Sequence, residues 1–438
     1  MNPDLIIHAG WIVPVNPAGT VLEAHSIVIG GGRILAVLPT AEARTLEGVT
    51  EELELPGHAL IPGLINAHTH AAMSLLRGLA DDLPLMEWLN GHIWPAEQKW
   101  VSEEFVHDGT LLAMAEMLRG GVTCFNDMYF FPDCTARAAV MAGMRATIGL
   151  IVLDFPTVWA ADADEYLSRG LEIHDQFRND ALIRTAFAPH APYSVSDGPL
   201  ERIRMLADEL EIPVHMHVHE TADEVRAAVT ATGKRPLRRL AEMELLSSSL
   251  MAVHMTQLDA EDKALLYASG ASVIHCPESN LKLASGFCPV AELAENGVNV
   301  AIGTDGAASN NDLDMIGEMR TAALLAKGVS GDAASVPAAD ALRMATLNGA
   351  AALGIEDETG SLEKGKSADI AAVHLGDVEE SPLYHVLSQL VYATGRDKVT
   401  DVWIRGRQVL RNRRLTTLDQ EAILQRARAW QDRISGRG

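Results

Sequence analysis

The middle of the chain, from about residue 57 to 355, alternates short apolar runs with polar clusters and helical patterns. Eight apolar runs rich in Val, Ile and Ala begin at residues 59, 122, 145, 183, 212, 250, 271 and 298. Helical periodicity covers 103–119 and 199–211, and Pro199 suits the first position of a helix. Eight alternating strand and helix units predict an α/β fold, a (β/α)₈ TIM-type barrel.

The two ends of the chain share a different pattern. Residues 4–37 alternate β-branched runs with glycine-rich turns, and this pattern returns after residue 366. The pairs Gly31-Gly32 and Arg405-Gly406 have the composition of hairpin turns. We therefore predict three parts: a small β-sandwich domain built from residues 1–56 and 356–415, a catalytic barrel over 57–355, and a C-terminal helix over 416–438.

Ionisable residues gather at the ends of the predicted strands. In nearly every run the apolar residues come first and the ionisable residue last, at His68, His70, Asp127, Asp154, His190, His217, His254, His275 and Asp305. Surface polar residues have no reason to prefer one end of a strand. In a barrel these positions meet at the C-terminal mouth, where the active site lies.

Composition narrows the classes of partner. A net charge of -24 repels polyanions, so neither nucleic acid nor an anionic membrane is an expected partner. The arginines between residues 405 and 428 are interpreted as a solvated face. Four cysteines without C-x-x-C spacing, no signal peptide and no apolar run of about 18 residues predict a soluble, cytoplasmic protein with reduced thiols.

The stretch "GLINAHTHAAM" supplies two imidazoles at the end of the first run. Side chains alternate along a strand, so His68 and His70 point to the same side. His217 offers a third nitrogen from the fifth run, and Asp305 offers an oxygen from the eighth. Three imidazoles and one carboxylate suit a divalent transition metal such as Zn²⁺ or Fe²⁺, whereas Mg²⁺ and Ca²⁺ prefer oxygen ligands.

The fifth run, "HMHVHE", leaves a choice among three histidines on one face, namely His215, His217 and His219. His217 is the preferred ligand because it leaves Glu220 where the strand turns into a loop and a carboxylate can lean over the metal. His215 is then expected deeper in the barrel.

The motifs "PGLINAHTH", "HVHET", "AVHMTQLD" and "AIGTDGAASNNDLDM" resemble the amidohydrolase superfamily, in particular its 5'-methylthioadenosine/S-adenosylhomocysteine deaminases, over essentially the whole chain. The resemblance implies the same ligands: His68, His70, His217 and Asp305. Two-metal members carry a carboxylated lysine on the fourth strand, but "IRTAFAPHAPYS" has no lysine. We therefore expect one divalent ion per chain and hydrolysis at a ring amidine carbon rather than amide-ring opening.

A mechanism follows from these residues. A bound divalent metal lowers the pKa of water to about 7, which makes hydroxide available at neutral pH. Asp305 is expected to accept the water proton and deliver it to the leaving amine, Glu220 to protonate a ring nitrogen, and His254 to orient the hydroxide. The alternative for Glu220 is a solvated carboxylate at a helix start in "ETADE".

The resemblance also implies substrate contacts. Glu97, in "WPAE", is assigned to the ribose hydroxyls, His190 to the purine ring, and Arg145 to the far end of the substrate. A carboxylate that accepts hydrogen bonds from a diol selects a nucleoside over a free base. The segment after Arg145 offers no second arginine, so 5'-methylthioadenosine or adenosine is preferred to S-adenosylhomocysteine.

The long connection over residues 71–100 is expected to form a lid. Its large apolar residues are candidates for a methylthio pocket, although such a stripe is also typical of plain packing: Met86, Trp88, Leu89 and Trp94.

Three alternatives stay open. The same machinery could serve a triazine aminohydrolase or chlorohydrolase, or a deaminase of guanine or another purine or pterin. A metal-binding barrel without catalysis is a third possibility, although Glu220 and His254 are both present. A homo-oligomer, dimer or tetramer, is expected by resemblance.

Overall fold

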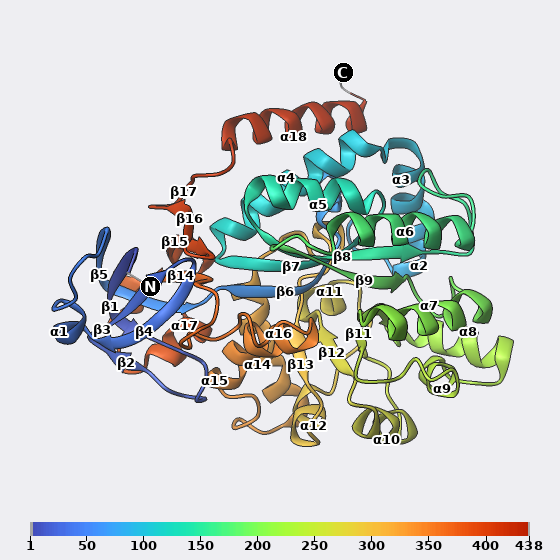
Figure 1. Ribbon diagram of the computed structural model, residues 1–438. Coiled ribbons are helices and arrows are strands. Elements are labelled where there is room, and N and C mark those ends of the chain that lie inside the picture. Colours follow the sequence, from blue (N-terminus) through green and yellow to red (C-terminus); the bar gives the residue numbers. More distant parts are fainter. Residues whose placement is uncertain (1–2, 437–438) are drawn as a thin grey trace.

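The central sheet of the computed structural model, which describes residues 3–436, is a barrel of eight strands in chain order (Figure 1). Each neighbouring pair is parallel. Each predicted apolar run contains one barrel strand, so the TIM-type barrel is confirmed. The strands are β6 (Leu64–Thr69), β7 (Val122–Tyr129), β8 (Arg145–Val152), β9 (Ile183–Pro189), β10 (Val214–Val218), β11 (Leu250–His254), β12 (Ser272–His275) and β13 (Val300–Ile302).

The last strand meets the first where the barrel closes. Just beyond β13, the backbone N–H of Asp305 donates to the carbonyl oxygen of His68 at 3.0 Å. Gly303 permits this approach, because a Cβ there would lie 2.7–2.9 Å from atoms of His68. The contact brings Asp305 beside His68.

Helices between the strands cover the outside of the barrel (Figure 1). The helices predicted over 103–119 and 199–211 correspond to α4 and α7. Polar residues begin several of them by accepting a hydrogen bond from a first-turn backbone N–H, as Ser102 does for α4. The covering helices are α4 (Glu103–Arg119), α5 (Pro132–Ala142), α6 (Ala163–Phe177), α7 (Asp197–Leu210), α8 (Ala222–Thr232), α9 (Pro236–Glu242), α10 (Ala260–Ser269), α11 (Pro277–Lys282), α12 (Val290–Glu295), α14 (Met315–Ser330), α15 (Ala338–Met344) and α16 (Leu347–Ala352).

Both ends of the chain build a second, mixed sheet, as the shared pattern predicts. Its hydrogen-bonded path is β17-β16-β15-β14-β5-β1-β3-β4, with β2 beside β1. Figure 1 shows the N-terminal strands in blue beside the C-terminal strands in red. The strands are β1 (Leu5–Ile12), β2 (Leu22–Glu23), β3 (His25–Gly30), β4 (Arg33–Pro39), β5 (Glu51–Pro62), β14 (Ile370–His374), β15 (Val399–Ile404), β16 (Arg407–Arg411) and β17 (Arg414–Leu415).

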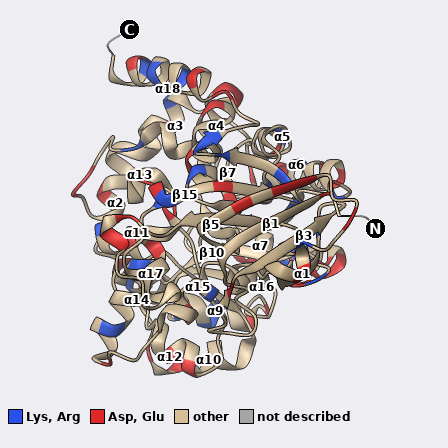
Figure 2. Ribbon diagram, turned by 90° about the vertical axis from the view of Figure 1, so that its left-hand side faces the viewer, with Lys and Arg blue, Asp and Glu red and all other residues tan. Residues whose placement is uncertain are grey.

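Strand β5 links this sheet to the barrel. It begins with an acidic stretch, visible as red ribbon in Figure 2, and runs through residue 56 to Pro62 before Gly63 leads into β6. Its hydrogen bonds to β14 reach Pro62, so the sheet continues past the predicted boundary. The predicted hairpin turns occur at Gly31-Gly32 and Arg405-Gly406, where all four residues have positive φ angles.

The C-terminal helix α18 (Gln420–Ser435) lies against α4 (Figure 1). Its Trp430 Nε1–H donates to Asp108 of α4 at 3.0 Å, and Arg426 pairs with the same carboxylate at 2.8 Å. The helix α17 (Val386–Tyr392) packs on α14 and α15 of the barrel. No helix within residues 3–436 combines the length and apolar character needed to cross a membrane.

Candidate metal centre and catalytic cavity

Four predicted ligands converge at the mouth of the barrel. The Nε2 atoms of His68 and His217 lie 3.2 Å apart. One oxygen of Asp305, Oδ1, lies 3.4 Å from His68 Nε2 and 3.3 Å from His70 Nε2. His254 also belongs to this cluster, because its ring nitrogen lies within 4.8 Å of ligand atoms of His68 and Asp305. The four donors come from the ends of three strands, β6, β10 and β13.

Backbone carbonyls fix the tautomers of two rings. His70 Nδ1 lies 2.5 Å from the Met128 carbonyl oxygen, and His217 Nδ1 lies 2.8 Å from that of His190. A carbonyl only accepts hydrogen bonds, so both Nδ1 atoms carry a proton, and Nε2 is the ring atom of each histidine that can bind a metal. Three Nε2 atoms and a carboxylate oxygen therefore point toward one place. This donor set fits a divalent metal of the zinc type.

A buried histidine supports the first ligand from behind. His215 Nε2 lies 2.9 Å from His68 Nδ1, and burial holds the pKa of His215 well below its usual value. His219 turns away, because its backbone has a φ of +54° and its ring bonds the Gln257 carbonyl and the Leu237 N–H. Of the three histidines on this run, His217 reaches the cluster directly and His215 lies deeper, as expected.

Two serine hydroxyls hold the Asp305 carboxylate. Ser279 donates to Oδ2 at 2.7 Å and Ser309 donates to the same atom at 2.9 Å, while the Gly306 N–H donates to Oδ1. Burial favours the neutral acid, but hydrogen bonds with His68 and His70 hold the pKa of Asp305 well below its usual value. Asp305 is therefore an anion with one oxygen directed at the histidines.

Glu220 and His254 face each other beside the cluster. His254 Nε2 lies 3.8 Å from Glu220 Oε2, and His254 Nδ1 lies 2.8 Å from Asn280 Oδ1. The amide oxygen of Asn280 accepts a hydrogen bond from the His254 Nδ1–H, which leaves Nε2 as the acceptor on the Glu220 side. Burial raises the pKa of Glu220, which favours the protonated acid.

A second carboxylate, missed by the sequence analysis, supports the turn that carries Glu220. Glu224 accepts hydrogen bonds from the backbone N–H groups of Glu220, at 2.7 Å, and His219, at 3.2 Å. Burial raises the pKa of Glu224 to about 7. The residue lies in "ETADE", where its spacing resembles an ordinary helix start, so no local signal marks this role.

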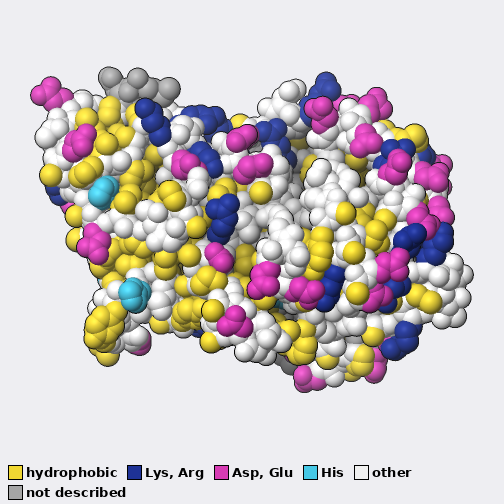
Figure 3. Space-filling view, turned by 90° about the horizontal axis from the view of Figure 1, so that it is seen from below, with side chains coloured by type: hydrophobic (Ala, Val, Ile, Leu, Met, Phe, Trp, Pro, Cys, Tyr) yellow, Lys and Arg dark blue, Asp and Glu magenta, His cyan; other side chains and the backbone are white. Residues whose placement is uncertain are grey.

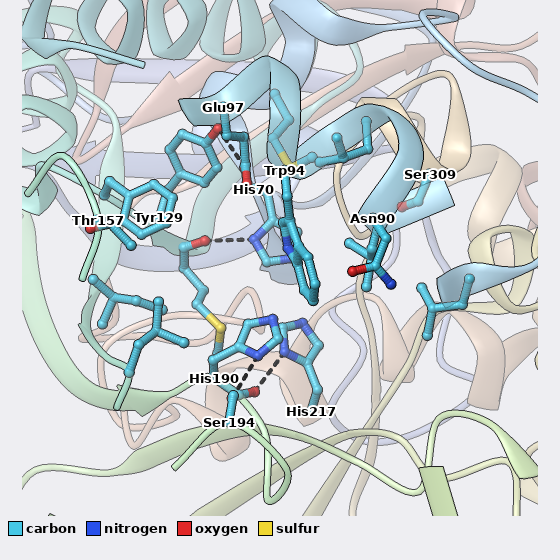
Figure 4. Close-up of a pocket in the computed structure, with 18 of the residues that line it drawn as sticks. His70, Asn90, Trp94, Glu97, Tyr129, Thr157, His190, Ser194, His217 and Ser309 are labelled. Carbon is cyan, nitrogen blue, oxygen red and sulfur yellow. Dashed lines mark hydrogen bonds between the residues drawn. The ribbon is translucent and has the colours of Figure 1, made fainter. Parts of the chain in front are cut away.

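A cavity of about 910 Å³ opens over the cluster (Figure 4). Figure 4 shows Glu97 and Tyr129 together on one side of this cavity, with His190 and His217 on the other. Burial raises the pKa of Glu97 to about 7 and lowers that of His190 to about 3, so His190 is neutral. His70, Glu220, His254 and Asp305 also line the cavity. The structure thus brings the predicted metal ligands together with Glu97 and His190.

A family model described as "Amidohydrolase family" matches residues 59–409, which is most of the chain. The chain belongs to the amidohydrolase family. A protein of Saccharophagus degradans named 5-methylthioadenosine/S-adenosylhomocysteine deaminase is 52% identical over 98% of this chain and 97% of its own length. A protein of the same name from Teredinibacter turnerae is 51% identical over 99% of this chain and 98% of its own length.

Solved structures agree with this membership. An adenosine deaminase from Xanthomonas campestris with bound zinc superposes on this amidohydrolase with a TM-score of 0.98, 56% identity and 99% coverage of both chains. An atrazine chlorohydrolase from Arthrobacter aurescens has a TM-score of 0.91 at 23% identity, covering 97% of this chain and 99% of its own. The latter similarity establishes the shared fold alone.

The connection over residues 71–100 covers one side of the amidohydrolase cavity. It contains η1 (Ala71–Leu76), α2 (Leu85–Trp88), a π-helical turn η2 (Leu89–Ile93) and α3 (Trp94–Trp100). Trp88, Leu89 and Trp94 line the cavity, as expected for an apolar pocket. Met86 is 41% exposed and does not line it, so its predicted place in the pocket is wrong.

Arg145 lies away from the amidohydrolase cavity, which corrects the prediction that it contacts substrate. It is the first residue of β8, at the opposite end of the strand from the mouth. Its guanidinium is buried and pairs with Asp369 at 3.2 Å and with Glu358 at 3.1 Å. Arg145 therefore joins the barrel to the second sheet. Among the described residues that line the cavity, none is lysine or arginine.

Proposed function

We propose that this amidohydrolase removes the amino group of an adenine nucleoside by hydrolysis, with 5'-methylthioadenosine as the preferred substrate and 5'-methylthioinosine and ammonia as products. One observation carries the proposal: the four metal donors meet at the mouth of the barrel, and three of them line one cavity together with Glu220, His254 and Glu97. The names of relatives 52% and 51% identical to this chain support the same activity.

His68, His70, His217 and Asp305 would hold one divalent ion. Zn²⁺ is favoured by the donor set and by the zinc in the Xanthomonas relative, and Fe²⁺ is the alternative. When bound, such an ion lowers the pKa of water to about 7 and supplies hydroxide at neutral pH.

The protein's own residues move the protons. Glu220, whose pKa is raised by burial, holds a proton and gives it to a ring nitrogen, so that negative charge does not build up on the ring. His254 Nε2, fixed by Asn280, orients the attacking oxygen. Asp305 takes a proton from that oxygen and delivers it to the amine. A carbon–oxygen bond forms, the carbon–nitrogen bond breaks, and ammonia leaves. The other proton of the water restores the Glu220 acid.

Substrate selection is proposed to come from the cavity walls. The Glu97 carboxylate would accept hydrogen bonds from the ribose hydroxyls, and neutral His190 would contact the purine ring. Trp88, Leu89 and Trp94 suit an apolar 5' substituent. Because no described lining residue is cationic, the carboxylate of S-adenosylhomocysteine would lack a partner. Adenosine and S-adenosylhomocysteine are therefore expected to be poorer substrates.

A spectrophotometric assay of metal-replete protein tests the proposal. We expect 5'-methylthioadenosine to have the highest kcat/KM, followed by adenosine and then S-adenosylhomocysteine, with ammonia released in equal amount to product. Equal rates on 5'-methylthioadenosine and free adenine would remove the nucleoside assignment. If the protein turns over guanine or a triazine but none of the three nucleosides, its activity is that of another kind of amidohydrolase.

Partners and location complete the proposal. On the face in Figure 3, acidic side chains lie among basic ones, and the net charge of -24 disfavours nucleic acid and anionic membranes as partners. A cytoplasmic location and a homo-oligomer, dimer or tetramer, stay predictions. Cell fractionation and light scattering test them.

A further inference from the structure

Glu97 and Tyr129 connect two separate parts of the cavity wall. Glu97 lies on α3, in the connection over the cavity, whereas Tyr129 is the last residue of barrel strand β7. The Tyr129 hydroxyl donates to Glu97 Oε1 at 2.8 Å (Figure 4). Tyr129 is only 4% exposed, and its ring packs against Phe130 with centroids 5.2 Å apart. The donor is therefore held in place by the barrel.

This hydrogen bond links the segment 85–100 to the barrel. Two other side chains in the segment make hydrogen bonds that stay within the same connection, from Trp88 to the Ala80 carbonyl and from Asn90 to the Met86 carbonyl. Within the described structure, Glu97–Tyr129 is the side-chain hydrogen bond that leaves segment 85–100 for a barrel strand. Otherwise the segment is held by apolar contacts.

The bond also fixes the direction of the carboxylate. An ionised carboxylate offers two oxygens with about four acceptor positions. Tyr129 occupies one position on Oε1. Oε2 and the remaining position on Oε1 stay available, and two neighbouring hydroxyls of a sugar need two acceptors at a fixed separation. A carboxylate that rotates freely loses side-chain entropy when it binds a ligand. A carboxylate that is already fixed in the free protein loses less.

We propose that Tyr129 is a positioning residue, which fixes the Glu97 carboxylate for the 2' and 3' hydroxyls of a ribose. This inference rests on the proposed nucleoside activity. Its consequence is specific: the Tyr129 hydroxyl contributes to binding only when the ligand carries both ribose hydroxyls.

A substrate and variant cycle tests this dependence. Tyr129→Phe and the unchanged protein are compared on 5'-methylthioadenosine and on its 2',3'-dideoxy analogue. We expect the variant to raise KM about tenfold for the diol substrate, which corresponds to one hydrogen bond to a charged group, with kcat within about twofold. For the dideoxy analogue the two proteins should have the same KM. Equal KM increases on both substrates, or none on the diol substrate, would overturn the inference.

Tyr267→Phe is the matched control. It removes another tyrosine–glutamate hydrogen bond, from Tyr267 to Glu292 at 3.1 Å, on a surface helix outside the cavity. Its kinetics should equal those of the unchanged protein.

Equilibrium binding separates this inference from the proposed function. Calorimetry measures the Kd of 5'-methylthioinosine and its dideoxy analogue without any turnover. Weakened binding of the diol ligand alone in Tyr129→Phe supports the positioning role even if the unchanged protein fails to deaminate 5'-methylthioadenosine. If the unchanged protein deaminates 5'-methylthioadenosine, but the effect of Tyr129→Phe is the same with and without the ribose hydroxyls in both the kinetic and the binding experiment, the activity is supported and the role of Tyr129 is refuted.

Discussion

The backbone N–H of Asp305 donates a hydrogen bond to the carbonyl oxygen of His68 at 3.0 Å. The same contact closes the barrel and sets the first proposed metal ligand beside the last, with Asp305 Oδ1 3.4 Å from His68 Nε2. Asp305 reaches this position with a φ of +61°, a conformation unfavourable for a residue other than glycine. Barrel closure and metal binding should therefore respond to the same substitutions.

Gly303→Ala tests this coupling. The added Cβ would meet atoms of His68 at 2.7–2.9 Å and push β13 away from β6. We expect the free energy of unfolding to fall by about 1–3 kcal/mol and zinc content to fall with it, measured by urea unfolding and elemental analysis. Gly328→Ala on α14, where a Cβ meets nothing within 4 Å, should keep both values or gain slightly in stability. A Gly303→Ala variant that loses stability but keeps normal zinc content would show that barrel closure and metal binding are not coupled.

Glu220→Gln removes the proposed proton donor but no proposed ligand. We expect kcat to fall by about 10²–10⁴-fold, because an amide cannot transfer the proton, while zinc content stays unchanged. Steady-state kinetics and elemental analysis on the same preparation give both values. Glu209→Gln, at an exposed position on α7, should behave as the unchanged protein. A Glu220→Gln variant with nearly full kcat would show that another group protonates the ring nitrogen.

Arg145→Met should reduce stability and leave substrate binding intact. Removing the guanidinium leaves buried Asp369 without its cationic partner, which costs about 3–5 kcal/mol in the free energy of unfolding. Arg184→Met, whose half-exposed side chain pairs with Glu358, should cost less than about 1 kcal/mol. Chemical unfolding and KM for 5'-methylthioadenosine measure the two effects. A raised KM in folded Arg145→Met would indicate that Arg145 contacts the substrate.

The pH dependence of KM reports on Glu97. Burial raises the pKa of this carboxyl to about 7, so it is neutral below that pH and ionised above it. The ionised form accepts both ribose hydroxyls, so KM for 5'-methylthioadenosine should fall about tenfold from pH 6 to pH 8, following the ionised fraction. The 2',3'-dideoxy analogue and the variant Glu97→Gln should lack this decrease. A KM for 5'-methylthioadenosine that does not change with pH would indicate that the ribose does not bind Glu97.

Much of the barrel, and the meeting of the proposed metal ligands at its mouth, could be predicted because both follow local patterns. Each strand is an apolar run, and ionisable residues such as His68, His217 and Asp305 follow the apolar part of their runs. Parallel strands carry those ends to one mouth. Residue type and spacing alone were therefore enough to predict these positions at one site, without any distance information.

The rest depends on contacts between distant segments. Tyr129 and Asn280 gain their roles only when β7 meets α3 and β11 meets α11. His219 breaks the strand alternation because its backbone enters the left-handed region, which the residue type does not signal. Arg145 begins its strand instead of ending it, and its buried partner Asp369 lies far along the chain. Resemblance alone suggested a substrate contact that the position on the strand excludes.

The most direct test of the metal centre is anomalous diffraction at the zinc absorption edge from crystals of metal-replete, active protein. The proposal predicts one peak per chain, bonded to the Nε2 atoms of His68, His70 and His217 and to the carboxylate of Asp305. A peak coordinated by other side chains, or full activity from crystals with no metal at this mouth, would contradict it.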